Sequence, residues 1–148
     1  MDQPCNATAL RKASRRVTQL YDDALHGCGL RSTQYAILSE LQRRSAEPPT
    51  MGELAEALVL DRSALGHTLR PLERDGLVAF RASPTDKRRT HVVLTPAGRA
   101  RHRSARRLWE RGQAHFEQVV GALEARALRE TLLAIAADDR LAGIGRGA

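Results

Sequence analysis

The chain has few aromatic residues, two cysteines and no long apolar run. Its 148 residues include one tryptophan, two tyrosines and two phenylalanines. Alanine, leucine and valine must therefore supply most of the core, a composition that suits helices. No apolar run approaches the roughly 20 residues that span a bilayer, and the opening residues, Met-Asp-Gln-Pro, show no signal-peptide pattern. We expect a cytoplasmic, mainly helical protein with no membrane partner.

The two cysteines, Cys5 and Cys28, do not predict a disulfide framework. The segment between them has a helical pattern, and about 20 residues at 1.5 Å each would hold them roughly 30 Å apart. Disulfide partners need Cα atoms within about 7 Å, so we expect both thiols to be free within one chain. The histidines show no metal-ligand spacing, and we expect no metal or other cofactor.

Basic residues outnumber acidic ones by 24 to 17, which gives a formal net charge of +7. Such a balance favours a nucleic-acid or anionic partner, although alone it is weak support. The sequence contains no glycine-rich phosphate loop, nucleophile elbow or paired acid–base motif. We therefore predict no catalytic residues and no enzyme.

Apolar periodicity predicts helices toward both ends of the chain. The first covers residues 6–26, and the second covers residues 32–44 with Ser32 as its N-cap. Later in the chain, Thr95 caps a long helix that reaches about residue 123, and a last helix covers roughly residues 124–137. The first and last helices carry more apolar surface than one small domain can cover, so we expect a two-fold homodimer.

Residues 50–98 predict two helices and a β-hairpin. Thr50 and Glu53 fit a capping box for a short helix, and Asp61 caps the helix that follows and that Gly76 closes. Residues 77–82 and 90–94 have the composition of strands, and a turn with a basic tip joins them. This order predicts a winged helix-turn-helix: a mostly α fold with a small β-hairpin wing, flanked by N- and C-terminal dimerisation helices.

The helix over residues 61–75 has an apolar face and a second stripe that is polar at its start and basic at its end. The stripe consists of Ser63, Gly66, His67 and Arg70. In a winged helix-turn-helix such a helix enters the major groove. There His67 and Arg70 would read base edges, and Arg62 and Ser63 would meet phosphates near the helix N-terminus. The alternative is a solvated helix face.

The tip of the predicted wing carries Lys87, Arg88 and Arg89. A hairpin in this position reaches the neighbouring DNA backbone or minor groove, and a narrow minor groove attracts arginine through its negative potential. We predict that these three side chains contact DNA. The alternative is an exposed basic loop.

Several motifs in this order resemble the MarR (multiple-antibiotic-resistance regulator) family of bacterial transcription factors. Asp86-Lys87-Arg88, followed by Leu94-Thr95 and Gly98, is similar to the family's wing signature. The stretches LDRSAL, from Leu60, and LERDGLV, from Leu72, are similar to its helix-turn-helix. The likeness runs from Leu10 to Ile135.

The resemblance implies that the helix over residues 61–75 is the recognition helix, that Asp86 holds the wing by pairing with an arginine, and that Arg88 enters the minor groove. It also implies a DNA-binding domain over residues 32–95, with residues 1–31 and 96–148 forming the dimer. Members commonly repress genes and release DNA when a small anionic or phenolic ligand, or an oxidant, acts on them.

Four residues are candidates for lining a ligand cleft between the dimerisation and DNA-binding parts: Arg15, Tyr21, Tyr35 and Trp109. An effector of the anionic or phenolic kind would suit them. The alternative is that they are core and dimer-seam residues, which need no ligand.

Cys5 is the candidate for redox chemistry, because it precedes the first helix and a helix N-terminus can lower a thiol pKa. The family's organic-hydroperoxide sensors carry a reactive cysteine near this point. Alignment on Thr18 and Tyr21 places that cysteine at Ala7, however, and puts Arg11 where those sensors have a supporting tyrosine. The mismatch favours a terminal cysteine without a sensing role.

We therefore predict a homodimeric, sequence-specific repressor that binds a pseudo-palindromic operator in double-stranded DNA, because its two recognition helices would lie about one helical turn apart. One alternative is a thiol-based redox-sensing repressor that uses Cys5. The other, which is less supported, is a winged-helix dimerisation module of a larger enzyme assembly, since such modules do not need a basic wing tip.

Overall fold

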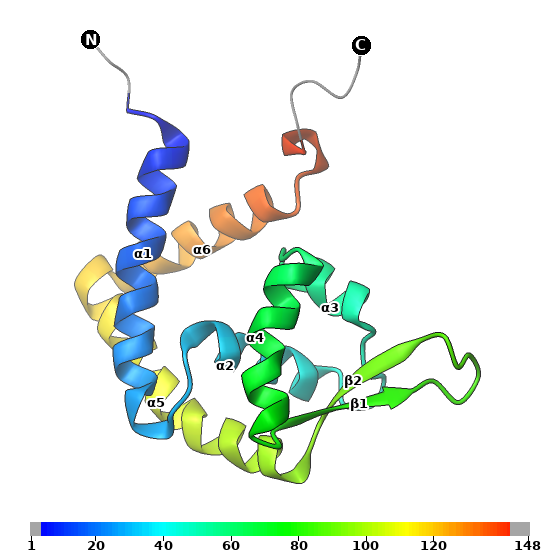
Figure 1. Ribbon diagram of the computed structural model, residues 1–148. Helices are drawn as coiled ribbons and strands as arrows, with labels where there is room; N and C mark the ends of the chain where they lie inside the picture. The colour runs from blue at the N-terminus through cyan, green and yellow to red at the C-terminus, as the bar shows by residue number, and fades with distance from the viewer. Residues whose placement is uncertain (1–3, 143–148) are drawn as a thin grey trace, which may run out of the picture. The chain divides into compact units, whose positions relative to one another are not determined.

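The structure, a computed structural model, describes residues 4–142 and is helical apart from one hairpin (Figure 1). The elements, in chain order, are α1 (Asn6–Leu25), a 3₁₀ turn (His26–Cys28), α2 (Ser32–Arg43), α3 (Met51–Ala57), α4 (Arg62–Arg74), β1 (Val78–Ala82), β2 (Thr90–Leu94), α5 (Pro96–Val120), α6 (Ala122–Ala136) and a 3₁₀ turn (Asp139–Leu141). The predicted fold class is confirmed. Residues 1–3 and 143–148, the outer ends of the predicted dimerisation segments, lie outside the described residues. No described helix has the length and apolar character to cross a membrane.

The chain divides into two compact units, Met1–Gly112 and Gln113–Ala148, and the division falls within α5. The first unit contains α1 to α4, the hairpin and most of α5. The second contains the end of α5 and all of α6. The elements predicted to bind DNA therefore all lie in the first unit.

Local capping signals in the sequence correctly place the two helices of the helix-turn-helix. The Thr50 hydroxyl accepts a hydrogen bond from the Glu53 N–H (3.2 Å), and the Glu53 carboxylate accepts one from the Thr50 N–H (3.0 Å). The Asp61 carboxylate accepts a hydrogen bond from the Ala64 N–H at 2.7 Å. Gly76 follows α4 with a φ of +70°, a conformation that glycine adopts without strain.

The predicted N-cap of α2 is wrong. Ser32 is the first residue of the helix and Arg31 is the N-cap. The Ser32 N–H donates to Asp22 Oδ1 on α1 at 2.7 Å, and the Arg31 N–H donates to Gln34 Oε1 at 2.9 Å. A carboxylate from another helix thus satisfies the start of α2, so no hydroxyl cap at Ser32 is needed.

The boundary between the last two helices also differs from the prediction. α5 ends at Val120 and α6 begins at Ala122, because Gly121 has a φ of +102° and interrupts the helical path. Leu123, which the apolar pattern assigned to the long helix, therefore belongs to α6.

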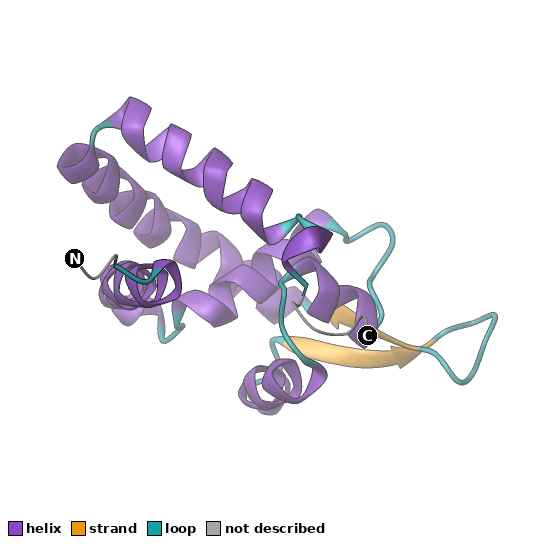
Figure 2. Cartoon of the chain, turned by 90° about the horizontal axis from the view of Figure 1, so that it is seen from above, coloured by secondary structure: helices purple, strands orange, loops and turns teal. Residues whose placement is uncertain are grey.

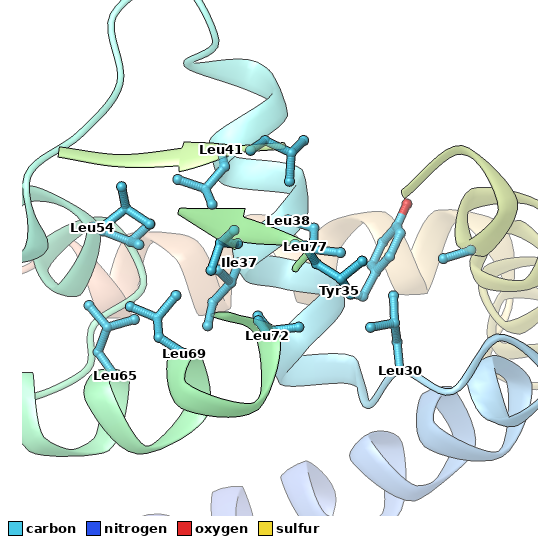
Figure 3. Packing of buried hydrophobic residues seen from close by; sticks show 14 of the residues in the cluster. Leu30, Tyr35, Ile37, Leu38, Leu41, Leu54, Leu65, Leu69, Leu72 and Leu77 are labelled. Atoms are coloured by element: carbon cyan, nitrogen blue, oxygen red, sulfur yellow. The ribbon is translucent and has the colours of Figure 1, made fainter. Parts of the chain in front are cut away.

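Leucine side chains make up most of the core of the first unit (Figure 3). Leu65, Leu69 and Leu72 form the buried face of α4, as their spacing predicts. α2 contributes four further buried residues, which are Tyr35, Ile37, Leu38 and Leu41. The core fixes the orientation of α4, because burying one face leaves the opposite stripe outside.

The wing is an antiparallel pair in which Val78 is opposite Leu94 and Ala82 is opposite Thr90. It extends away from the helices (Figure 2). A two-stranded hairpin alone is marginally stable in water, and here β2 is also bonded on its outer edge. The Val92 N–H donates to the Pro49 carbonyl at 2.9 Å, and Thr50 and His91 form an isolated bridge. The segment before α3 therefore anchors the base of the wing.

Gly98 lies where the first turn of α5 meets the start of the hairpin. A Cβ atom at this position would lie 2.0 Å from the Leu77 carbonyl oxygen and 2.8 Å from Leu94 Cδ1. We predict that Gly98→Ala lowers the free energy of unfolding by about 3 kcal/mol, since a backbone oxygen in a packed core cannot move aside. Urea unfolding followed by circular dichroism measures the change.

Gly66→Ala is the matched control, because a Cβ atom there would meet nothing within 4 Å. Alanine in an open helical position should raise the free energy of unfolding by about 0.5–1 kcal/mol. Equal unfolding midpoints for the Gly98→Ala variant and the wild type would contradict the close approach.

Candidate nucleic-acid interface and ligand groove

The predicted recognition stripe lies on the surface of α4. Ser63, His67 and Arg70 are exposed and Gly66 is half-buried, while the leucines of the same helix are buried. No side chain comes within 4 Å of the position of a Cβ atom on Gly66, so another molecule can approach the helix backbone closely there. The four predicted residues thus form one open face.

Arg62 takes a different position from the rest of the stripe. Its guanidinium lies over the start of α3, where a Cβ atom on Gly52 would be 3.0 Å from Arg62 Nη2. The side chain is nevertheless exposed, and it adds positive charge to the N-terminal end of α4. A phosphate at this end would meet both the guanidinium and the helix dipole.

The turn of the wing is built differently from the family expectation. No ion pair joins Asp86 to an arginine among the described residues. Its carboxylate instead accepts a hydrogen bond from the Arg88 N–H at 3.0 Å, and its carbonyl accepts one from the Arg89 N–H at 3.0 Å. Asp86 shapes the turn through the backbone, which leaves the side chains of Lys87 and Arg88 exposed at the tip.

Arg89 has a partner that the sequence did not reveal. Its Nη2 lies 3.6 Å from Glu53 Oε1 on α3, and Arg44 Nη2 lies 3.4 Å from the other oxygen of the same carboxylate. The pKa of Glu53 is lowered, chiefly by the Thr50 N–H and then by Arg44, Arg89 and His91. No local signal could have paired residues this far apart in the chain.

The turn between α3 and α4 holds a strained residue. Val59 has a φ of +53° and is 69% exposed, and a left-handed conformation costs a residue with a Cβ atom about 1–2 kcal/mol. The Leu60 N–H donates to the Ala55 carbonyl at 2.9 Å and fixes the turn. Strain of this kind is concentrated at functional segments, and Val59 lies in the turn that joins α3 to the recognition helix.

Three of the four ligand candidates line one groove of the first unit. Tyr21, Tyr35 and Trp109 border a depression of about 550 Å³, together with Ser32, Ala36, Ser39, Glu40, Arg43 and Leu58. Arg15 lies elsewhere, in a separate depression between α1 and the loop before α2. The groove offers aromatic surfaces, hydroxyl groups and one ion pair, between Glu40 and Arg43.

His102 stacks on one of these aromatic residues, and no pattern in the sequence pointed to it. Its ring stacks on that of Tyr35, with centroids 5.3 Å apart and an interplanar angle of 12°. The ring of Trp109 also stacks on that of Tyr35, with centroids 5.9 Å apart. His102 Nε2 lies 3.0 Å from Ser39 Oγ. Burial lowers the pKa of His102, with a smaller contribution from Arg106, and burial raises the pKa of Tyr35.

Both cysteines are free, as predicted. Cys5 is the exposed N-cap of α1. The pKa of its thiol is lowered, chiefly by hydrogen bonding to the Thr8 backbone. Cys28 is half-buried, and its thiol donates to the Leu25 carbonyl at 3.0 Å. The described residues contain no group of three or more side chains suited to hold a metal ion.

A short helix, a strained turn, a second helix with one open face and a hairpin with a basic tip define a winged helix-turn-helix protein. The chain belongs to the MarR family, and a family model described as MarR family matches residues 29–89.

Solved relatives share the fold over most of their length. The transcriptional regulator MosR of M. tuberculosis, in complex with DNA, is 32% identical, with 90% of this chain and 94% of that chain covered and a TM-score of 0.79. The transcriptional repressor CouR on a 23-mer DNA duplex is 28% identical, with 89% and 92% covered and a TM-score of 0.79. CouR from Rhodococcus jostii RHA1 bound to p-coumaroyl-CoA is 26% identical, with 87% and 90% covered and a TM-score of 0.74.

Among curated relatives, the transcriptional activatory protein BadR of Rhodopseudomonas palustris is 30% identical over 115 residues, which cover 74% of this chain and 62% of that protein. The chain spans about 60% of the length of the curated relatives that it matches.

The lowered pKa of His102 predicts a pH dependence of stability. The unfolded chain takes up a proton on this ring at the ordinary histidine pKa of about 6.5, whereas the folded chain does so only at lower pH. As the pH falls below about 6.5, the unfolded state binds more protons and stability decreases. His102→Phe, which keeps an aromatic ring against Tyr35, should flatten this decrease between pH 7.5 and pH 5.5, as measured by urea unfolding.

His67→Asn is the control, because it retains His102 and should keep the wild-type decrease. The lowered pKa values of Glu40 and Glu53 act below this window, since the ordinary carboxyl value is already about 4.3. A His102→Phe variant that still loses as much stability as the wild type between the two pH values would refute the assignment.

Proposed function

We propose that the chain is a homodimeric, sequence-specific DNA-binding regulator, a repressor that a small ligand releases from its operator, and that it is not an enzyme. One observation carries this proposal: α4 turns an open stripe outward beside a hairpin whose basic tip is exposed. The relatives support it, because MosR and CouR are DNA-bound regulators. BadR, by contrast, is an activatory protein.

In this proposal α4 lies in a major groove. Arg70 and His67 read base edges, and Arg62 and Ser63 meet phosphates at the helix N-terminus. Gly66 lets the helix backbone approach the DNA, because nothing within 4 Å fills the space beside it. Residues 32–95 would form this DNA-binding domain.

The wing completes the proposed interface. Asp86 holds the turn through backbone hydrogen bonds, which leaves the basic side chains of the tip free to reach DNA. We assign Arg88 to the minor groove, whose negative potential attracts a guanidinium, and Lys87 and Arg89 to the sugar-phosphate backbone.

Residues 1–31 and 96–148 would form the dimer. The end of α5 and α6 expose large apolar side chains, including Val119 (71%), Leu123 (78%) and Leu133 (63%). A second copy of the chain would remove this surface from water, and two-fold pairing is the commonest arrangement for such a surface. The operator would then be pseudo-palindromic.

The effector would be a small anionic or phenolic molecule in the groove of Tyr21, Tyr35 and Trp109. Aromatic walls suit a flat phenolic ring. Arg43, which is paired with Glu40 in this structure, would have to turn from that carboxylate to meet a negative charge. CouR, which binds p-coumaroyl-CoA, supports this ligand class. Arg15, in the separate depression, would take no part in binding this ligand.

We predict that Arg70→Ala lowers the preference for an operator over a scrambled duplex by about tenfold, because a bidentate base contact is worth about 1–3 kcal/mol.

Arg88→Ala should weaken binding to the operator and reduce the slope of log affinity against log salt by about 1. Fluorescence anisotropy measures both, with a labelled duplex from upstream of the protein's own gene, the scrambled duplex and two salt concentrations.

Arg103→Ala is the matched control. Arg103 is exposed on α5, so the substitution removes one positive charge at a position outside the stripe and the wing. Unchanged operator affinity in Arg88→Ala would show that the wing assignment is wrong. A wild-type protein with no preference for the upstream duplex over the scrambled one would count against sequence-specific regulation at that site.

A redox-sensing repressor is the second candidate, and the lowered thiol pKa of the exposed Cys5 favours it. A thiolate, and not a thiol, reacts with peroxide. If Cys5 is the sensor, peroxide should weaken DNA binding by the wild type and by Cys28→Ser but not by Cys5→Ser, in the same anisotropy assay. A wild type whose affinity is unaffected by peroxide would leave the thiol without a sensing role.

A further inference from the structure

We propose that Glu53, an acidic residue on α3, is a positioning residue for DNA binding that orders the wing and aims Arg89 at a phosphate. This inference rests on the proposed function, since it concerns how the same DNA-binding surface is built. DNA binding would then require the negatively charged side chain of Glu53, although DNA itself repels a negative charge.

One carboxylate joins three segments of the chain. Glu53 Oε2 accepts the Thr50 N–H at the start of α3 (3.0 Å) and lies 3.4 Å from Arg44 Nη2, just after α2. Glu53 Oε1 lies 3.6 Å from Arg89 Nη2 in the wing. The carboxylate therefore occupies the point where α2, α3 and the hairpin meet.

The position of Arg89 along the wing gives this contact its effect. Backbone bonds from Pro49 and Thr50 hold β2 at Val92 and His91, but they stop there. Arg89 immediately precedes β2, where the anchored base becomes the projecting tip. Among the described residues, its pairing with Glu53 is the one ion pair that joins residues 83–89 to a helix.

The contact is suited to orientation and not to stability. The side chains of Glu53 and Arg89 are 42% and 58% exposed, and ion pairs with this exposure contribute little to folding. The capping bond to Thr50 already fixes the carboxylate, however, so that pairing must order only the arginine. With Nη2 directed to Glu53, the remaining N–H groups of Arg89 are left for a phosphate.

Two physical accounts predict opposite signs for Glu53→Gln. If charge alone matters, removing an acid near DNA strengthens binding. If Glu53 positions Arg89, the same change weakens binding. Glutamine is the appropriate substitute because its side-chain oxygen can still accept the Thr50 N–H in a capping box, so that α3 should remain capped while both ion pairs are lost.

Glu56→Gln is the matched control. Glu56 lies on the same helix, is exposed, and forms no ion pair among the described residues. Both variants lose one negative charge from α3, and both are compared with the wild type by anisotropy on the labelled upstream duplex at low salt. We expect Glu53→Gln to bind about threefold more weakly than the wild type, in keeping with one surface ion pair, and Glu56→Gln to bind no more weakly than the wild type.

The same change in an Arg89→Ala background tests the route. There, Glu53→Gln should have little further effect on affinity, because the arginine that it orders is absent. Glu53→Gln binding as tightly as the wild type, or more tightly, would overturn the proposal. So would a full threefold loss in the Arg89→Ala background.

A measurement without DNA separates this inference from the proposed function. Trypsin should cleave after Lys87 and Arg88 at the wing tip about threefold faster in Glu53→Gln than in the wild type or in Glu56→Gln, since loss of one surface ion pair frees the tip. If the wild type binds no duplex, the proposed function fails. The rate of trypsin cleavage then still decides whether the Glu53–Arg89 ion pair orders the wing. Equal cleavage rates in the three proteins would overturn the ordering of the wing by Glu53.

Discussion

The junction at Leu77, Thr95 and Gly98 is the constraint on which the DNA-binding unit depends. The Leu77 carbonyl accepts the Thr95 N–H at 3.1 Å, and Gly98 approaches the same oxygen too closely for any Cβ atom. The Thr95 hydroxyl donates to the neighbouring Gly76 carbonyl at 2.6 Å and lies 3.1 Å from the Leu77 oxygen. This oxygen therefore fixes where the hairpin returns and where α5 begins. Because Thr95 also caps α5 through the Gly98 N–H (2.9 Å), a single threonine ends the wing and starts the long helix.

The wing needs this support because two strands make a poor independent structure. The junction holds one end, and the segment before α3 holds the outer edge of β2. His91 adds a side-chain bond, since its Nδ1 lies 2.7 Å from the Pro48 carbonyl oxygen. With its base held on both sides, the hairpin can project a tip that consists almost entirely of polar and charged residues, and such a tip has no core of its own.

The sequence predicted features whose causes are local. The capping residues Thr50 and Asp61, the glycine that closes α4 and the strand-forming composition of residues 90–94 all act within a few residues, and each prediction is confirmed. The stripe of exposed residues on α4 followed from helical periodicity alone, because three leucines on one face determine which face is buried.

Features whose causes come from distant segments could not be predicted in this way. α2 is capped by Asp22 from α1, so the hydroxyl of Ser32 was an attractive but unnecessary candidate. Arg89 of the wing is paired with Glu53 on α3, whereas the family pattern implied only that Asp86 pairs with an arginine. His102 is brought to Tyr35 by the packing of α5, and nothing in its own neighbourhood in the sequence indicates a buried ring.

In the proposed function, α2 connects the ligand groove to the recognition helix. Tyr35 and Ser39 face the groove, while Ile37, Leu38 and Leu41 of the same helix are buried in the core shared with Leu65 and the other leucines of α4 (Figure 3). A packed core does not deform continuously, so that a displacement of α2 must be passed to α4 or resisted by it. A ligand can shift the protein away from DNA only by as much as it binds the displaced state more tightly. Tyr35 and Trp109, which stack on each other and both line the groove, come from α2 and α5, so a ligand between these helices would contact both.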